Sequence, residues 1–299
     1  MRVAGAVDIG GTRTKIGLVT EDAQIVKRVT ISTTDRGDPQ PLVDGIVAAL
    51  SPLLDEARAN NSEIAGLGVS VAGFLDKQRS AMVANANLPA LCGFPLRDVL
   101  EQRLNLPCSL EVDSNAATIG EFRHGAGAGS RRLLGATVGT GLGGGVIIDG
   151  AMLRYMGECA GDLGHIIVAP NGRECTCGAR GCLEAMVCSA ALVQRARKRA
   201  VREIVSAAQR GDKRARTAIN ETARWLGIGL ASLTPLFHPD RIVIGGGVSA
   251  SGSLLMRPLR KAYAAHVAPE FHDVEIVSSS LHGWEGMVGA ASIVFQPMP

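Results

Sequence analysis

The stretch that decides the fold is Val3-Ala-Gly-Ala-Val-Asp8-Ile9-Gly10-Gly11-Thr12-Arg13-Thr14-Lys15-Ile-Gly-Leu-Val19. An apolar strand over residues 3–9 runs up to an acidic tip, a glycine turn follows, and a second strand begins at residue 15. The glycines expose main-chain N–H groups, which can line a concave anion site. The turn is not a Walker A loop, because the Gly-x4-Gly-Lys-Ser/Thr spacing is absent. Taken alone, the turn is explained equally well by an ordinary hairpin or by a phosphate loop partnered by Thr12, Thr14 and Lys15.

The same layout returns in the middle of the chain. A predicted strand at 132–139 leads into Gly139-Thr140-Gly141-Leu142-Gly143-Gly144-Gly145, and a further strand follows at 146–149. This loop opens a strand and not a helix, so it does not fit the dinucleotide-binding fingerprint. The repetition indicates two domains of related topology. A nucleoside triphosphate lying between two such lobes would touch one glycine hairpin from each.

The remaining pattern alternates strands with helices. Apolar spacing predicts strands at 24–33, 64–71 and 110–112, and helices at 42–59, 94–104 and 114–124. The second half is richer in helix, with segments at 190–208, 214–232, 254–266 and 286–295. A late strand at 241–244 runs into Gly245-Gly246-Gly247. The fold class is therefore α/β.

Three thiols and one imidazole gather in Gly164-His165-Ile-Ile-Val-Ala-Pro-Asn-Gly-Arg-Glu-Cys175-Thr-Cys177-Gly-Ala-Arg-Gly-Cys182-Leu-Glu184. His165, Cys175, Cys177 and Cys182 make a complete tetrahedral ligand set of the kind that structural zinc sites use. A closed set leaves no open position, so this metal would shape the protein and not do chemistry. A metal-free loop or a disulfide is the alternative, but Cys-x-Cys is too short for an easy bridge, and the spacing favours zinc.

Composition excludes several classes of protein. The chain has 299 residues, 46% of them hydrophobic, with 37 glycines, which is typical of one large or two ordinary globular domains. Only 3% of residues are aromatic, which argues against stacking surfaces for single-stranded nucleic acid. A net charge of +3 is too small to imply a polyanionic partner. We therefore expect small-molecule ligands and no nucleic acid.

The same sequence gives expectations about location. No uninterrupted apolar run is long enough to span a membrane. The chain enters a strand at once, which argues against a signal peptide. The spacing of the seven cysteines does not indicate a set of disulfides, so we expect the protein in the reducing cytoplasm.

Asp113 stands between the two glycine loops, at the end of a predicted strand. A carboxylate where a strand gives way to a helix can act as a general base on a substrate hydroxyl. When this position is taken alone, helix capping by Asp113 or Ser114 explains it better.

Together these motifs resemble the ROK family (repressors, open reading frames, kinases). The resemblance rests on Asp8-x-Gly-Gly-Thr12-x-x-Lys15, the loop at 139–145, the Gly-His to Cys-x-Glu segment at 164–184 and the late Ile-x-x-Gly-Gly-Gly-Val. It covers essentially the whole chain. The family contains bacterial glucokinases, N-acetylmannosamine and N-acetylglucosamine kinases, fructokinases and allose kinases. The resemblance implies two actin-like (ribonuclease H-like) lobes around a central cleft, formed by 1–112 plus 288–299 and by 113–287 with a zinc loop at 164–184.

The resemblance also assigns roles to residues. The first phosphate loop would comprise Asp8, Gly10, Gly11, Thr12, Thr14 and Lys15, and the second Gly139, Thr140, Gly141 and Gly143. The adenosine side would use Gly245, Gly246 and Gly247. Asp113 would take the proton of the sugar 6-hydroxyl. The sugar would be bordered by Asn87, Asp162, His165 and Glu184, and His165 would also bind zinc.

Two positions depart from the family pattern. Val112 stands where the family usually has a sugar-binding Asn, and Asp162 stands where it usually has Glu. Losing one hydrogen bond to a buried hydroxyl can cost about 1–3 kcal/mol, and Asp is one methylene shorter than Glu. The general chemistry survives these changes, but the identity of the sugar is left open.

The function implied is an ATP- and Mg²⁺-dependent transfer of the γ-phosphoryl group to the 6-hydroxyl of a hexose, such as a glucose-like sugar, N-acetylmannosamine or another amino sugar. The competing interpretation is a ROK-type sugar-binding or regulatory protein with little or no kinase activity. Repressors of the family carry a helix-turn-helix domain ahead of the first hairpin, and here the hairpin begins at residue 8. The resemblance also implies a homodimer or homotetramer.

Overall fold

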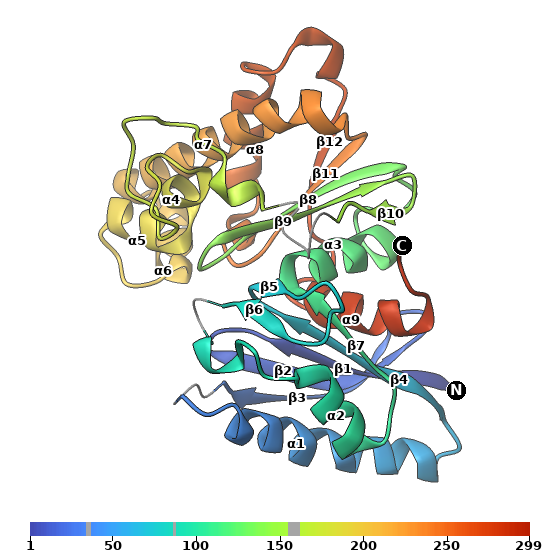
Figure 1. Cartoon of the computed structure of the whole chain (residues 1–299). Coiled ribbons are helices and arrows are strands. Elements are labelled where there is room, and N and C mark those ends of the chain that lie inside the picture. Colours follow the sequence, from blue (N-terminus) through green and yellow to red (C-terminus); the bar gives the residue numbers. More distant parts are fainter. Residues whose placement is uncertain (34–36, 86–87, 155–161) are drawn as a thin grey trace. The chain divides into compact units, whose positions relative to one another are not determined.

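The computed structural model describes residues 1–33, 37–85, 88–154 and 162–299. The described chain forms two compact units, each built on a mixed β-sheet with helices (Figure 1). The first unit contains Met1–Gly125, residues 151–154 and Trp284–Pro299, and the second contains Ala126–Gly150 and residues 162–283. The α/β class is confirmed.

The first unit begins with the predicted hairpin. Strands β1 (Arg2–Ile9) and β2 (Arg13–Thr20) pair antiparallel with Asp8 opposite Lys15. The sheet order is β3-β2-β1-β4-β7, where β3 is Ile25–Ser32, β4 is Glu63–Val71 and β7 is Cys108–Val112. β4 is parallel to both β1 and β7, so these three strands end at the same edge of the sheet.

Helices cover both faces of this sheet. Helices α1 (Gln40–Ala59) and α2 (Leu96–Leu104) bury their leucines with Val3, Val7 and the other large apolar side chains of one face. The opposite face carries small residues such as Ala4 and Ala6, which pack against α9 (Glu285–Phe295). A short hairpin of β5 (Phe74–Leu75) and β6 (Met82–Ala84), followed by the turn η1 (Pro89–Leu91), precedes α2.

Helix α3 (Asp113–His124) follows β7 directly and packs against α9. A Cβ atom on Gly289 of α9 would lie only 1.7 Å from the main-chain oxygen of Ala116. Glycine therefore lets the two helices approach closely. Because of this packing α3 lies in the first unit, whereas the family resemblance implies a second lobe that begins at residue 113.

The second unit holds β9 (Leu142–Ile148), β8 (Arg132–Val138), β11 (Arg241–Gly245) and β12 (Glu275–Ser278), side by side in that order. After β9 the chain passes through β10 (Ala151–Met152). The helices are α4 (Leu183–Val187), α5 (Ser189–Ala196), α6 (Val201–Gln209), α7 (Lys213–Phe237) and α8 (Ser253–Ala264), with short turns η2 (Leu163–His165), η3 (Ser249–Ser251) and η4 (Pro269–Phe271).

Two details correct the sequence expectations. The single helix predicted over 190–208 is two helices, because Arg197 adopts a left-handed conformation (φ 52°) that ends α5. The glycines at 143–145 lie inside β9 and pair with residues 135–137 of β8, so the turn itself is shorter than predicted. Among the described residues, no helix has the length and apolar character needed to cross a membrane.

Candidate functional site

The predicted metal ligands lie together in the second unit. The side-chain nitrogen or sulfur atoms of His165, Cys175, Cys177 and Cys182 all lie within 4.8 Å of one another. The Sγ atoms of Cys177 and Cys182 are 3.7 Å apart, and Cys175 Sγ is 3.6 Å from His165 Nδ1. These thiols are free, so the disulfide alternative does not apply.

These distances fit a tetrahedral zinc ion. With Zn–S bonds of about 2.3 Å, two thiolates of one tetrahedron lie about 3.8 Å apart, close to the Cys177–Cys182 distance. Burial raises the pKa of the Cys182 thiol to about 12 and also raises that of Cys175. A hydrogen bond from the main chain of Ala179 lowers the pKa of Cys177. The donor set and its spacing therefore suit a structural zinc.

Asp162 lies on the other side of the His165 ring. Its Oδ2 atom is 3.6 Å from His165 Nε2, while Nδ1 faces the thiols. Metal-ligating histidines commonly present their second nitrogen to a carboxylate, which fixes the orientation of the ring. The pKa of Asp162 is raised, because burial and the nearby Glu184 carboxylate outweigh the lowering effect of His165. The structure thus brings Asp162, His165 and Glu184 together.

Glu184 connects this group to the second glycine loop. It lies in the first turn of α4, and its Oε2 atom accepts a hydrogen bond from the main-chain N–H of Leu142 at 2.8 Å. A Cβ atom on Gly141 would lie 2.3 Å from the same oxygen, and one on Gly164 would lie 2.3 Å from the Leu142 oxygen. Both glycines therefore permit the close packing of the loop at 139–142 against the residues that follow Asp162.

The third glycine stretch lies at the same sheet edge of the second unit. β8 and β11 are parallel, with Gly245 opposite Thr137, so their carboxyl ends are neighbours. Val248 donates its N–H to the oxygen of Val138 at 3.0 Å. Gly246 has a φ of 81°, and a Cβ atom there would lie 2.4 Å from that oxygen. The loops at 139–142 and 245–248 therefore lie next to each other at the carboxyl ends of these two strands.

In the first unit the corresponding loop is built around Asp8. Its Oδ2 atom accepts a hydrogen bond from Lys15 Nζ, and its Oδ1 atom accepts one from Ser70 Oγ, both at 3.0 Å. Lys15 Nζ also lies 5.7 Å from the centre of the Trp284 ring. A Cβ atom on Gly286 would lie 2.8 Å from Asp8 Oδ1, so glycine keeps space beside this carboxylate.

One predicted phosphate ligand is used differently. Thr14 is completely buried, and its hydroxyl lies 2.8 Å from the hydroxyl of Thr33. It joins β2 to the segment after β3, so its side chain is not available to a phosphate. Gly11 and Thr12, at the tip of the turn, are exposed.

Asp113 is the first residue of α3, and its Oδ1 atom accepts the N–H of Ser114 at 2.7 Å. The neighbouring Val112 is only 6% exposed, and its side chain belongs to the hydrophobic core that α1 and α2 share with the sheet. Asn87, the remaining predicted sugar neighbour, lies outside the described residues.

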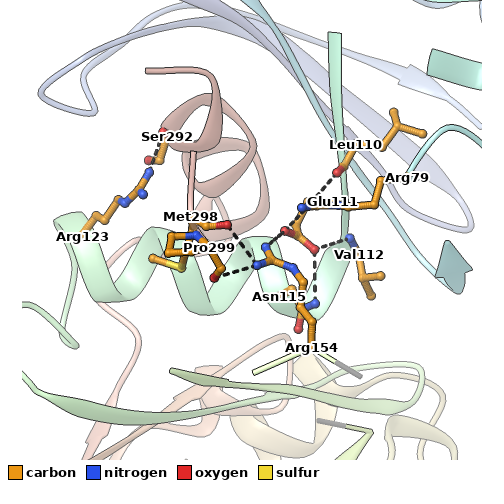
Figure 2. A network of polar contacts seen from close by, with 10 residues as sticks. All are labelled: Arg79, Leu110, Glu111, Val112, Asn115, Arg123, Arg154, Ser292, Met298 and Pro299. Carbon is orange, nitrogen blue, oxygen red and sulfur yellow. Dashed lines mark hydrogen bonds and ion pairs between the residues drawn. The ribbon is translucent and has the colours of Figure 1, made fainter. Parts of the chain in front are cut away.

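One buried acidic residue, two positions before Asp113, is not indicated by the sequence pattern. Glu111 has no solvent exposure and contacts two arginines, Arg79 and Arg154 (Figure 2). The available signal was an acidic residue in the apolar strand Cys108-Ser-Leu-Glu-Val112. Its arginine partners lie too far along the chain for any local pattern to indicate them.

Comparison with known proteins gives matches over nearly the whole chain. The sequence matches the ROK family over residues 4–296. It is 35% identical over 317 residues to glucokinase from Streptomyces coelicolor (strain ATCC BAA-471 / A3(2) / M145), covering 98% of each chain. It is 33% identical over 291 residues to N-acetylmannosamine kinase from Escherichia coli (strain SE11), covering 96% of each.

A solved structure is also similar to this fold. The ROK family glucokinase from Streptomyces griseus, in complex with glucose and AMPPNP, matches this fold with a TM-score of 0.87 and 34% sequence identity, covering 98% of this chain and 99% of that one. The mixed-sheet fold and the motifs therefore define a ROK-type protein. The chain belongs to the ROK family, and the resemblance seen in its sequence is confirmed.

Proposed function

We propose that this protein is an ATP-dependent sugar kinase, which transfers the γ-phosphoryl group of ATP to the 6-hydroxyl of a hexose. Its similarity over nearly the whole chain to glucokinases and to an N-acetylmannosamine kinase supports this reaction class. The observation that carries the proposal is the bond between Glu184 Oε2 and Leu142 N–H. It fixes the carboxylate proposed to bind the sugar onto the loop proposed to bind the phosphates.

Asp113 is the proposed general base. A base must be ionised to accept the proton of the attacking hydroxyl. Asp113 lies in the first turn of α3, where the partial positive charge of the helix N-terminus favours a carboxylate. Deprotonation at the sugar oxygen would then accompany its attack on the γ-phosphorus, while the oxygen bridging to the β-phosphate departs with ADP.

The glycine loops would hold the triphosphate through main-chain N–H groups, because positioning and electrostatics supply most of the catalysis in phosphoryl transfer. Asp8 offers carboxylate oxygens, the ligand type that Mg²⁺ prefers, and Gly286 leaves space beside them. Lys15, already paired with Asp8, would supply positive charge near the phosphates. Mg²⁺ supplies the charge that offsets the polyphosphate when bound.

Zinc is proposed to act as a structural ion held by His165, Cys175, Cys177 and Cys182. Its role would be to fix the loop that carries His165 and, through Cys182, the start of α4 with Glu184. Asp162 would orient the histidine ring through Nε2. The sugar-binding side chains would thus depend on the metal without the metal touching the reacting atoms.

The proposed substrate is a glucose-like hexose, N-acetylmannosamine or another amino sugar. Asp162 is shorter than the usual Glu, and it lies beside His165. Val112 offers no hydrogen bond and is turned into the core. Discrimination between sugars would then depend on the remaining polar side chains. A site that forms no hydrogen bond to a given sugar hydroxyl rejects analogues without that hydroxyl only weakly. By its family resemblance, we also propose a homodimer or homotetramer, which light scattering would measure.

The test is a coupled ADP-release assay with Mg²⁺-ATP over glucose, mannose, fructose, allose, N-acetylglucosamine and N-acetylmannosamine. We expect sugar-dependent turnover with at least one of them, well above the rate with water alone. Sugar binding by calorimetry without turnover on any member would contradict the kinase and favour a sugar-binding regulatory protein.

A further inference from the structure

Glu111 is the centre of a polar network buried inside the first unit (Figure 2). Its Oε2 atom accepts hydrogen bonds from Arg79 Nη2 at 2.5 Å and from Arg154 Nη2 at 2.7 Å. A carboxylate in the interior is retained only when paired and hydrogen-bonded. Two guanidinium groups therefore hold this oxygen in place.

The other carboxylate oxygen of Glu111 faces the start of α3. Its Oε1 atom accepts the main-chain N–H of Val112 at 3.0 Å and the side-chain Nδ2 of Asn115 at 3.2 Å. These two partners flank Asp113 in the sequence. The carboxylate thus holds both sides of the short segment that carries the proposed base.

The arginines bring distant segments to the same point. Arg79 adopts a left-handed conformation (φ 53°) in the turn between β5 and β6, and its Nη2 atom also donates to the oxygen of Leu110 at 2.7 Å. Non-glycine residues in this region carry a conformational cost and persist where their surroundings hold them. Arg154 also donates through Nη1 to the oxygens of Met298 and Pro299, both at 3.0 Å.

The arrangement links the end of β7 with three other parts of the unit. The β5–β6 turn, the segment after β10 and the residues that follow α9 all meet at Glu111, through Arg79 and Arg154. Asp113 lies two residues further along the chain, between the Val112 and Asn115 contacts of Glu111.

We propose that Glu111, held by Arg79 and Arg154, is a positioning residue that fixes Asp113 for proton transfer. This inference rests on the proposed function, in which Asp113 is the base. Glu111 itself touches no substrate. A displacement of about 1 Å at a reacting group can cost roughly 100-fold in rate, so the tethers at Val112 and Asn115 would act directly on turnover.

The substitution Glu111→Gln isolates this role. Within the described part of the chain, the four partners of the Glu111 carboxylate are all donors. A glutamine amide offers one oxygen and one NH₂ group, so in either orientation a donor faces donors. We expect kcat to fall about 10- to 100-fold, while KM for ATP changes by less than about twofold because the phosphate loops are untouched.

A milder variant and a matched control accompany it. Asn115→Ala removes only the contact at the first turn of α3, and it serves if Glu111→Gln does not fold. Arg97→Gln is the control, because Arg97 also bonds the β5–β6 turn, through the oxygen of Gln78, but does not touch Glu111. We expect turnover of the control to stay near that of the wild type.

Two readouts separate positioning from general weakening. In a double-mutant cycle, Glu111→Gln should lower kcat little further once Asp113 is Asn, because the two residues act as one unit. Hydrogen exchange at residues 113–116 should rise in Glu111→Gln and Asn115→Ala. A multiplicative loss in the cycle, or unchanged exchange at these amides, would overturn the positioning role while leaving the kinase proposal intact. Near-normal turnover in Asp113→Asn alone would instead overturn the base assignment, and this inference with it.

Discussion

The Oε2 atom of Glu184 accepts the main-chain N–H of Leu142 at 2.8 Å. The other oxygen of the same carboxylate lies 3.5 Å from Thr176 Oγ1 and 3.8 Å from Cys175 Sγ. One side chain therefore contacts both the second glycine loop and the cysteine loop. Changes in either loop should consequently be felt in the other.

The first prediction concerns this carboxylate. Glu184→Gln replaces a charged acceptor by a weaker neutral one, and a hydrogen bond to a charged group is worth about 1.5–3 kcal/mol. We expect kcat/KM for the sugar to fall roughly 10- to 100-fold and ATP affinity to weaken as well. Steady-state kinetics and calorimetry would measure both. Glu174→Gln, which removes an exposed carboxylate of the same loop, is the control, and equal losses in both variants would contradict the coupling.

The second prediction concerns Gly141. A Cβ atom there would lie 2.3 Å from Glu184 Oε2, whereas one on Gly139 would meet nothing within 4 Å. We therefore expect Gly141→Ala to displace the Glu184 carboxylate and to weaken the binding of both ATP and sugar. Gly139→Ala should reduce these affinities less. Isothermal titration with a non-hydrolysable ATP analogue and with sugar would compare the two. A larger loss in Gly139→Ala would show that the close approach is not what limits this loop.

The third prediction concerns the metal. Purified protein should contain one zinc per chain by mass spectrometry, and Cys177→Ala should lose it. Loss of a structural metal is one of the changes that destabilise a protein strongly, so the free energy of unfolding should fall by at least about 2 kcal/mol. Cys92→Ala is the control, because Cys92 is an exposed free thiol outside the cluster. Full stability without zinc would refute a structural ion.

The fourth prediction concerns specificity. Val112→Asn would place an amide in the core of the first unit, so we expect a loss of about 1–3 kcal/mol in the free energy of unfolding, measured by denaturant titration. Asp162→Glu lengthens the side chain beside His165 and should change the ratio of kcat/KM between glucose and N-acetylmannosamine. An unchanged ratio would show that Asp162 does not face the sugar.

Local patterns were sufficient for much of this fold. Alternating and helical apolar spacing located the hairpin at 3–19, the strand ends and most helices, and ligand chemistry located the Cys₃His cluster. Those features depend on neighbours in the sequence. The break at Arg197 was missed because nothing in the run of helix-forming residues marks a left-handed conformation.

Features that depend on residues far apart in the chain could not be predicted from the sequence. The burial of Thr14 follows from Thr33, and the role of Glu111 follows from Arg79 and Arg154. The sequence also suggested that Val112 had lost a sugar contact, but only the sheet shows that its side chain faces the core. Such contacts form between strands and loops that the tertiary fold brings together.

Transfer to the sugar 6-hydroxyl with Asp113 as the base is tested by comparing the wild type with Asp113→Asn in the presence of Mg²⁺-ATP and the best sugar of the panel, with ³¹P NMR identifying the product. We predict that the wild type forms the hexose 6-phosphate. The variant, which keeps the shape but cannot accept the proton, should bind ATP normally and turn over roughly 10²–10⁴ times more slowly. Phosphorylation at another position would contradict the assigned reaction, and near-normal turnover of the variant would contradict the role of Asp113 as the base.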